Sequence, residues 1–268
     1  MPPRAVFLSP HHDDVCYSLA GTVAAIGGGD LVDLFTRSTY VERAMPLPAD
    51  PAARVEAVTR LRAAEDEAFA ARCGLERHDL GLDEPGLRGR TSFDLRALRS
   101  EVERLSAPLL GLLERLAARD RSQRAMLFCP LGIGGHVNHV ATLVAVAAAL
   151  PRLSPSYRVY FYEDLHYASR ADAREAGLER ARRALRGAAL VRRAVPLSPR
   201  RFADKMALVA LYRSQHRGEP DPSRFTPAAP GAAGPHEAVW SFAEPPGARR
   251  EPHAHQSSRT GPACSEST

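Results

Sequence analysis

Short apolar runs alternate with longer amphipathic segments along most of this chain. The runs that predict strands lie at residues 5–10, 31–39, 78–82, 125–130, 157–164 and 237–242. The segments with apolar positions at helical spacing lie at residues 18–26, 52–73, 93–118, 137–150, 171–186 and 201–213. Strands that alternate with helices in this way predict a doubly wound α/β fold, in which a mostly parallel sheet has helices on both faces.

Glycine and proline mark the limits of several of these segments. Gly74 predicts the end of the second helix, and Pro108 predicts a break or kink in the third. Residues 244–268 have the polar, Pro-rich composition of a disordered tail. We therefore expect one α/β domain over residues 1–243 and a disordered segment after it.

The charge balance does not indicate a nucleic-acid partner. The chain carries 36 Lys and Arg against 31 Asp and Glu, a formal charge of +5, but the basic residues are scattered. Nearly all of them are arginine, Lys205 being the only lysine, and no basic run has the interleaved aromatic residues of a base-stacking surface. We expect neither nucleic-acid nor membrane binding.

Cysteine usage and hydropathy indicate the compartment. The four cysteines are far apart in the sequence and include no CxxC pair, which argues against a disulfide framework and a thiolate zinc site. No apolar stretch approaches eighteen residues, and the N-terminus lacks the charged and apolar regions of a signal peptide. These features predict a soluble, cytoplasmic protein.

Two polar loops follow predicted strands. His11-His12-Asp13-Asp14 comes directly after the first strand, and PLGIGGHVNH, with His136 and His139, comes after the fourth. In an open α/β sheet, ligands bind beyond the carboxyl ends of the strands where the strand order reverses. We expect these two strands to be neighbours at that point, so that the loops face one another.

The residue types in these loops suit a divalent metal. His11 and Asp14 are three positions apart at the start of a helix, and His139 can supply a third ligand from the neighbouring loop. A catalytic zinc site takes three protein ligands of this kind and leaves a position for water. Asp13 and His136 would then remain beside the metal as acid and base groups.

Each loop alone also has a simpler explanation. Asp13 or Asp14 can cap the following helix, which stabilises a helix by about 1 kcal/mol, and Asn138 and His139 can be ordinary loop residues. A dinucleotide site is disfavoured, because Val137 occupies the third glycine position of the fingerprint. The occurrence of both polar clusters, each at a strand end, favours the metal interpretation, since a cation compensates the cost of grouping these charges.

The two loops resemble the motifs of one enzyme family. Ser-Pro-His-His-Asp-Asp resembles the His-Pro-Asp-Asp signature of the PIG-L/LmbE-like deacetylases, which often reads Ser-Pro-His-x-Asp-Asp, and His-Val-Asn-His resembles their second motif, His-x-Asp-His. Three supporting stretches resemble the family's R-x-x-E helix, its YYEDLPYA segment and its late K…Y-x-SQ helix; they lie at residues 62–74, 161–168 and 205–215. The resemblance covers roughly residues 4 to 216.

This resemblance implies a Rossmann-like sheet and zinc-dependent hydrolysis of an N-acyl group, commonly N-acetyl on an amino sugar. It implies one Zn²⁺ per chain, with His11, Asp14 and His139 as ligands. It also implies Asp13 as general base and His136 as the group that stabilises the oxyanion or protonates the leaving amine. The substrate would be a small N-acylated molecule, such as an amino-sugar intermediate of specialised metabolism.

Two departures from the family pattern concern the site. His12 stands in place of the usual proline, and we expect it to be a positioning residue; with Arg62 and Asn138 it is also a candidate for substrate binding. Asn138 replaces the aspartate of the second motif, and an asparagine can orient a neighbouring histidine without supplying charge. An imidazolium at His136 should therefore be less favoured.

The substitution at Asn138 leaves a second hypothesis open. A family member that binds metal and ligand without hydrolysis, or that catalyses another reaction, would carry the same scaffold. No readable pattern in the sequence encodes the acyl group, the molecule that bears it or the oligomeric state.

Overall fold

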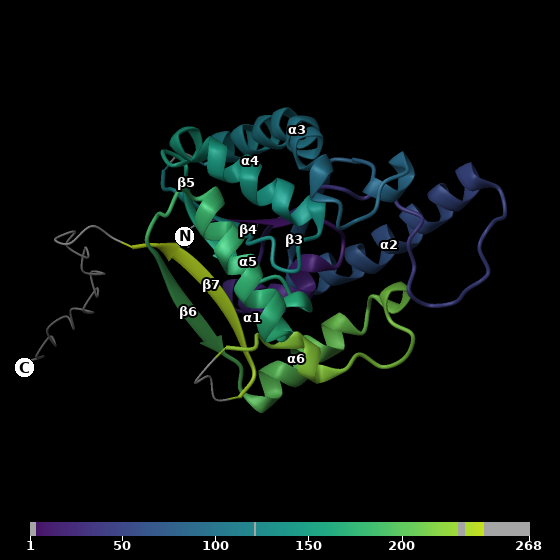
Figure 1. Ribbon diagram of the computed structural model, residues 1–268. Helices are drawn as coiled ribbons and strands as arrows, with labels where there is room; N and C mark the ends of the chain where they lie inside the picture. Colours follow the sequence, from purple (N-terminus) through teal and green to yellow (C-terminus); the bar gives the residue numbers. More distant parts are fainter. Residues whose placement is uncertain (1–3, 121, 230–233, 244–268) are drawn as a thin grey trace, which may run out of the picture.

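The structure is a computed structural model that describes residues 4–120, 122–229 and 234–243 (Figure 1). One sheet contains seven strands in the order β3-β2-β1-β4-β5-β7-β6. The strands are β1 (Ala5–Ser9), β2 (Gly29–Asp33), β3 (Leu75–Asp79), β4 (Ala125–Pro130), β5 (Tyr157–Tyr162), β6 (Leu190–Pro196) and β7 (His236–Phe242). β1 to β5 are parallel, and β7 is antiparallel to both of its neighbours. The predicted doubly wound, mostly parallel sheet is confirmed.

Helices cover both faces of this sheet (Figure 1). They are α1 (Asp14–Ile26), α2 (Pro51–Cys73), α3 (Leu98–Arg119), α4 (Val137–Leu153), α5 (Ala171–Ala184) and α6 (Pro199–Val209). Short 3₁₀ helices lie at η1 (Pro85–Arg88), η2 (Leu95–Ala97), η3 (Tyr167–Ser169), η4 (Arg213–Gln215) and η5 (Pro222–Phe225). α3 packs on α4 on one side of the sheet, and α1 packs on α2 and α6 on the other.

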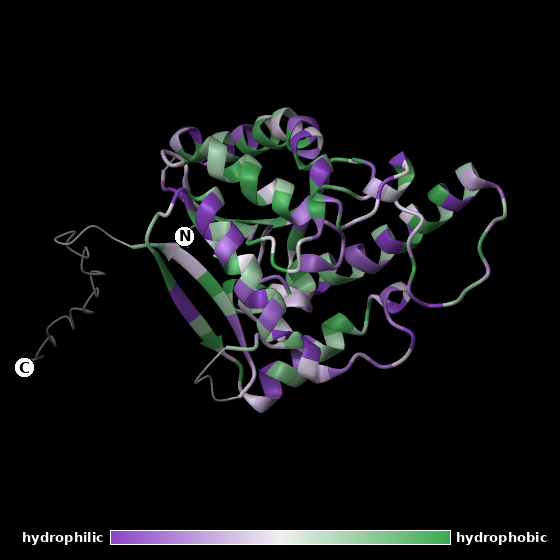
Figure 2. Cartoon of the chain, viewed as in Figure 1, coloured by the Kyte–Doolittle hydropathy of each residue, from purple (hydrophilic) through white to green (hydrophobic). Residues whose placement is uncertain are grey.

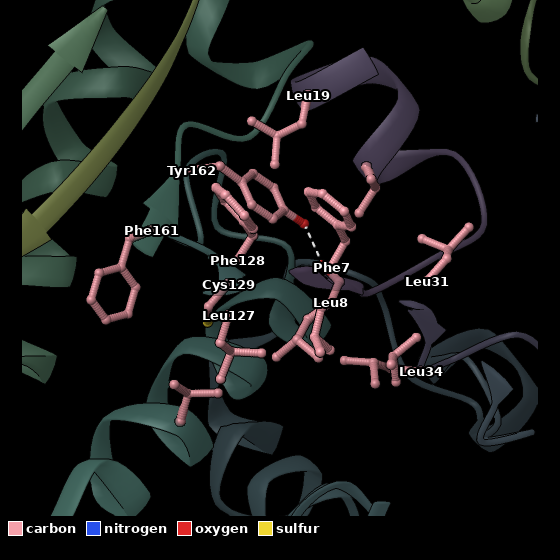
Figure 3. Packing of buried hydrophobic residues seen from close by; sticks show 14 of the residues in the cluster. Phe7, Leu8, Leu19, Leu31, Leu34, Leu127, Phe128, Cys129, Phe161 and Tyr162 are labelled. Atoms are coloured by element: carbon pink, nitrogen blue, oxygen red, sulfur yellow. Dashed lines mark hydrogen bonds between the residues drawn. The ribbon is translucent and has the colours of Figure 1, made fainter. Parts of the chain in front are cut away.

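The centre of the sheet is apolar on both faces, as expected for parallel strands covered by helices. Every residue of β1 is buried. Phe7 of β1 stacks on Phe128 of β4 with ring centroids 4.8 Å apart, and the Tyr162 hydroxyl donates a hydrogen bond to the Leu8 carbonyl oxygen at 2.8 Å (Figure 3). Figure 2 shows hydrophobic and hydrophilic positions alternating along the surrounding helices. The core therefore fixes the relative positions of β1 and β4, the strands that carry the two polar loops.

Some predicted boundaries differ from the structure. α1 begins at Asp14 instead of residue 18, so the second aspartate of the motif is already helical. β3 covers Leu75–Asp79 instead of residues 78–82. α3 runs through Pro108 without a break, because the loss of one N–H donor is outweighed by a buried leucine face that packs on α4.

The last two strands extend the sheet beyond its parallel part. The sequence does not predict β6, because two arginines and a proline interrupt its apolar pattern. In the structure no residue of β6 is fully buried. It is held by full antiparallel pairing with β7. The predicted tail at residues 244–268 lies outside the described residues. Within the described part of the chain, no helix is long and apolar enough to cross a lipid bilayer.

Candidate active site

The two polar loops meet at the carboxyl edge of the sheet. β1 pairs directly with β4, and the strand order reverses between them, as the sequence predicts. The five residues predicted as ligands or catalytic groups line one cavity of about 820 Å³; they are His11, Asp13, Asp14, His136 and His139. A cavity of about 990 Å³ between α5 and residues 222–229 and 234–236 is lined by none of them.

Three ligand atoms form a nearly equilateral triangle at this edge. Asp14 Oδ2 lies 3.1 Å from His11 Nδ1 and 3.2 Å from His139 Nε2, and the two nitrogens are 3.3 Å apart. Two atoms bound to the same zinc at about 2.1 Å, with bond angles between 90° and 109°, are separated by roughly 3.0 to 3.4 Å. The triangle therefore has the size that a tetrahedral or octahedral metal centre requires.

A second set of three residues overlaps with this triangle. His11, His136 and His139 also offer ligand atoms within 4.8 Å of one another. We favour Asp14 as the third ligand, because its carboxylate lies close to both other ligand atoms and is also fixed by the backbone N–H of His11 at 2.8 Å. His136 has a different use for one of its nitrogens, as described below.

The electrostatics of the triangle favour a positive charge. Burial lowers the pKa of His139, but the carboxylates of Asp14 and Asp164 outweigh this effect and raise it to about 10. Burial alone would raise the pKa of Asp14, but attraction to His139 and hydrogen bonding with both histidines hold that pKa well below its ordinary value. The surroundings that stabilise a protonated His139 and an ionised Asp14 would also stabilise a cation bound between them.

Asp164 holds His139 from behind, and sequence reasoning did not identify it as a site residue. Its Oδ1 lies 2.8 Å from His139 Nδ1, and its Oδ2 accepts the backbone N–H of Ile133 at 3.0 Å. The carboxylate keeps a proton on Nδ1 and leaves the Nε2 lone pair directed at the triangle. Asp164 lies just after β5, in the segment that resembles the family's YYEDLPYA, which was the available signal.

Asn138 has the equivalent position behind His11. Its side-chain amide lies 3.1 Å from His11 Nε2, and its Oδ1 is buried without a hydrogen-bond partner. A half-turn of the amide places Oδ1 at Nε2, where it accepts the imidazole proton. The Nδ1 lone pair of His11 then points at the triangle, as a metal ligand requires.

This contact corrects the expectation that Asn138 would orient His136 through its side chain. The backbone N–H of Asn138, and not the side chain, donates to His136 Nδ1 at 3.3 Å, so that His136 caps α4. The proton of the neutral ring is therefore on Nε2. Burial, together with the electrostatic effect of the neighbouring imidazoles, holds the pKa of His136 well below its ordinary value, which keeps the ring neutral near pH 7.

Asp13 is held by an arginine and not by the helix that it precedes. It occupies the N-cap position of α1, but its side chain caps no backbone N–H. Instead Asp13 Oδ1 accepts from Arg62 Nη2 at 3.2 Å, and Arg62 Nη1 donates to Glu84 Oε1 at 2.7 Å. The capping interpretation of Asp13 is therefore wrong. Arg62 is 3% exposed, so its main contacts are with these two carboxylates.

His12 packs against two buried carboxylates, unlike its neighbour His11. It is buried, its Nδ1 lies 3.6 Å from Asp33 Oδ2 and 3.8 Å from Asp66 Oδ2, and it does not line the cavity. The expectation that His12 contacts a substrate is therefore not met. Arg77 supplies the cation for both carboxylates, with Nε 2.8 Å and 3.3 Å from them.

The supporting sequence stretches at residues 62–74 and 205–215 meet next to the site. The backbone N–H and hydroxyl of Ser214 donate to Glu65 at 2.7 Å and 2.6 Å. The Tyr212 hydroxyl donates to Asp66 Oδ1 at 2.7 Å. These bonds attach the segment after α6 to α2, the helix that carries Arg62.

Comparisons with known proteins find similar deacetylases. No family model matches the chain. A curated relative from Streptomyces fradiae, a 2'-N-acetylparomamine deacetylase, is 36% identical over 192 residues. The alignment covers 69% of this chain, and the chain spans 64% of the length of that relative.

Solved structures of deacetylases share the fold. A deacetylase of the teicoplanin biosynthesis pathway has a TM-score of 0.63 at 17% identity, over 90% of this chain and 98% of its own. The A40926 pseudoaglycone deacetylase has a TM-score of 0.61 at 18% identity, over 91% and 100%. A zinc-inhibited form of the teicoplanin deacetylase has a TM-score of 0.55 at 17% identity, over 90% and 98%.

Proposed function

We propose that this chain is a metal-dependent N-deacetylase. It removes an acetyl group from the amino sugar of a specialised metabolite. The proposal starts from the resemblance to the PIG-L/LmbE-like deacetylases, with which these comparisons agree. The observation that carries the proposal is the triangle of His11, Asp14 and His139 in one cavity with Asp13 and His136. Two histidines oriented for metal binding, a carboxylate outside the triangle and a neutral imidazole are the groups that amide hydrolysis needs.

His11, Asp14 and His139 would hold one divalent cation, and zinc suits this set of two imidazoles and one carboxylate. When bound, such a cation polarises the amide carbonyl and makes a bound water more acidic. The ligand separations of 3.1, 3.2 and 3.3 Å support this assignment. The zinc-inhibited neighbour is the reason to test zinc alongside other divalent metals.

Asp13 accepts the proton from the attacking water. The contact with Arg62 uses Oδ1, and no described residue hydrogen-bonds Oδ2, which leaves that oxygen for this role. As the water oxygen bonds to the carbonyl carbon and the C–N bond breaks, the proton held by Asp13 passes to the departing nitrogen. The products are a carboxylic acid and an amine, and transfer of the acid proton to the amine gives the carboxylate and the ammonium ion, so the reaction is balanced without another reactant.

His136 stabilises the carbonyl oxygen as it becomes negative. Its Nδ1 accepts the backbone N–H of Asn138, so the Nε2–H is the group available to the substrate. A neutral donor of this kind requires no protonation near pH 7. The replacement of aspartate by asparagine at position 138 therefore does not remove the role of His136.

The substrate class follows from the relative that acts on 2'-N-acetylparomamine. We propose an N-acetylated amino sugar joined to a second ring, for which a cavity of about 820 Å³ has room.

The test is direct. Purified protein is stripped with a chelator, reloaded with Zn²⁺, Co²⁺ or Mn²⁺, and incubated with 2'-N-acetylparomamine. We expect equal amounts of acetate and free amine, formed only by the reloaded protein. Protein that retains about one equivalent of metal and releases no acetate from a panel of N-acetyl amino sugars would support the non-hydrolytic alternative instead.

A further inference from the structure

Two exposed aromatic rings line the candidate active site. Among the described residues, three large hydrophobic side chains are strongly exposed: Phe93 at 57%, Tyr40 at 53% and Val191 at 46%. Phe93 and Tyr40 line the cavity that contains the metal triangle, whereas Val191 lies on β6 at the far edge of the sheet. Exposed apolar surface that is concentrated at a polar cavity indicates a ligand that covers it.

Phe93 is fixed relative to the catalytic histidine. The carbonyl oxygen of the preceding residue, Ser92, accepts the backbone N–H of Val137 at 2.8 Å. The Phe93 ring makes a T-shaped contact with His136, with centroids 5.6 Å apart, and a second T-shaped contact with Tyr167 at 6.4 Å. The loop is therefore attached to the second motif itself, and Phe93 stays 57% exposed while it contacts His136.

Tyr40 is fixed on the side of the cavity that holds Asp13. Its hydroxyl donates to Glu42 at 2.6 Å, and its backbone N–H donates to Ser38 Oγ at 2.9 Å. The Ser38 hydroxyl in turn donates to Glu84, the partner of Arg62. Since its hydroxyl is already bonded, the ring face of Tyr40 is the part left for a ligand.

A sugar ring has the chemistry to cover these surfaces. A pyranose carries hydroxyl groups around its rim and apolar C–H groups on its faces, so its face stacks on an aromatic ring while its rim meets polar groups. Flat aromatic side chains supply large contact area at a low cost in side-chain entropy. The rest of the wall is polar, with His166, His216 and Arg224 among its members.

We propose that Phe93 and Tyr40 form a sugar-binding platform. The ring that bears the acetamido group stacks on Phe93, and the adjoining ring stacks on Tyr40. This inference rests on the proposed function, because it places the acetamido group between Asp13 and His136. It goes further in naming the residues that select a sugar over other N-acetyl amines.

Steady-state kinetics tests the platform. KM and kcat are measured for wild type, Phe93→Ala, Phe93→Trp and the control Val191→Ala, with 2'-N-acetylparomamine and with the acyclic N-acetylethanolamine. We expect Phe93→Ala to raise KM for the sugar about three- to tenfold, with kcat changed less than twofold. Phe93→Trp, which keeps an aromatic ring, should have a KM for the sugar close to that of wild type. The KM for N-acetylethanolamine and the metal content should be the same in all four proteins.

Several results would overturn the platform. An unchanged KM for the sugar in Phe93→Ala would do so, as would an equal rise in KM for both substrates. A change of oligomeric state in Phe93→Ala would also do so, because it would make Phe93 a subunit contact. If wild type hydrolyses neither substrate, the proposed function fails separately. Saturation-transfer NMR with glucosamine then decides the platform alone: a signal weakened at least threefold in Phe93→Ala supports it, and an equal signal contradicts it.

Discussion

Asp164 Oδ1 lies 2.8 Å from His139 Nδ1, on the side of the imidazole opposite Asp14. This contact fixes the tautomer of a proposed metal ligand from another part of the fold, since Asp164 follows β5 and His139 lies in the first turn of α4. A buried carboxylate behind a ligating histidine increases the basicity of the ligand and fixes its direction.

Replacing Asp164 with asparagine should weaken the metal site without unfolding the protein. Outer carboxylates of this kind typically change metal affinity or activity by about 10- to 100-fold, and we expect an effect of that size in Asp164→Asn. The measurement is competitive metal titration with a chelator. Glu163→Gln is the matched control, because this neighbouring buried carboxylate bonds Arg174 and Arg192 instead of a histidine. Equal affinities in Asp164→Asn and wild type would rule out this role.

Asn138 should act on the metal through His11 and not on the pH profile through His136. Asn138→Ala removes the side-chain partner of His11 and should weaken metal binding by roughly 10-fold or more, whereas Asn138→Asp should retain it. Thr142→Val is the control, because Thr142 bonds the Asn138 carbonyl on the same helix and does not contact His11. A shifted pH optimum with unchanged metal affinity would show that the side chain acts on His136 after all.

Arg62 should affect turnover while the metal remains bound. Arg62→Met leaves Asp13 without the contact that orients it, and we expect kcat to fall roughly 10- to 100-fold. Glu84→Gln, which leaves the Asp13–Arg62 pair intact, should change kcat much less. Metal analysis of both variants accompanies the kinetics. Similar kcat values in the two variants would mean that Arg62 has no special action on Asp13.

His166 should contribute to acid sensitivity. Burial and the nearby Arg224 lower the pKa of His166 from about 6.5 to about 4. Between these values the unfolded chain binds a proton that the folded protein does not, so stability is lost as the pH falls from 6.5 towards 4. Urea unfolding measures the free energy of unfolding at pH 7 and at pH 4.5. Its decrease between these two pH values should be smaller by about 2 kcal/mol in His166→Asn than in wild type. An identical loss would contradict this pKa.

The sequence predicts the position of the site better than the contacts that complete it. The apolar runs of β1 and β4 and the polar residues that follow them are local features, so the strands, their adjacency and the ligand set can be inferred from them. Asp164 and Glu84 could not be assigned in this way, because their roles depend on contacts with His139 and Arg62 across the fold.

The direction of a side chain in a tight loop also cannot be predicted from the sequence. His11 and His12 are adjacent and chemically identical, yet one faces the cavity and the other is buried against Asp33 and Asp66. Whether Asn138 would contact His136 or His11 likewise depends on how α4 packs on β4, the neighbour of β1. Both outcomes are set by tertiary packing.

The roles of Asp13 and the metal triangle are tested most directly by acetate release and metal content in two variants of adjacent residues. In zinc-loaded protein with 2'-N-acetylparomamine, Asp13→Asn should keep about one equivalent of metal while acetate release falls about 10²- to 10⁴-fold, the usual contribution of a general base. Asp14→Asn should lose the metal together with the activity. Asp13→Asn that keeps its metal and hydrolyses the substrate at the wild-type rate would contradict the mechanism.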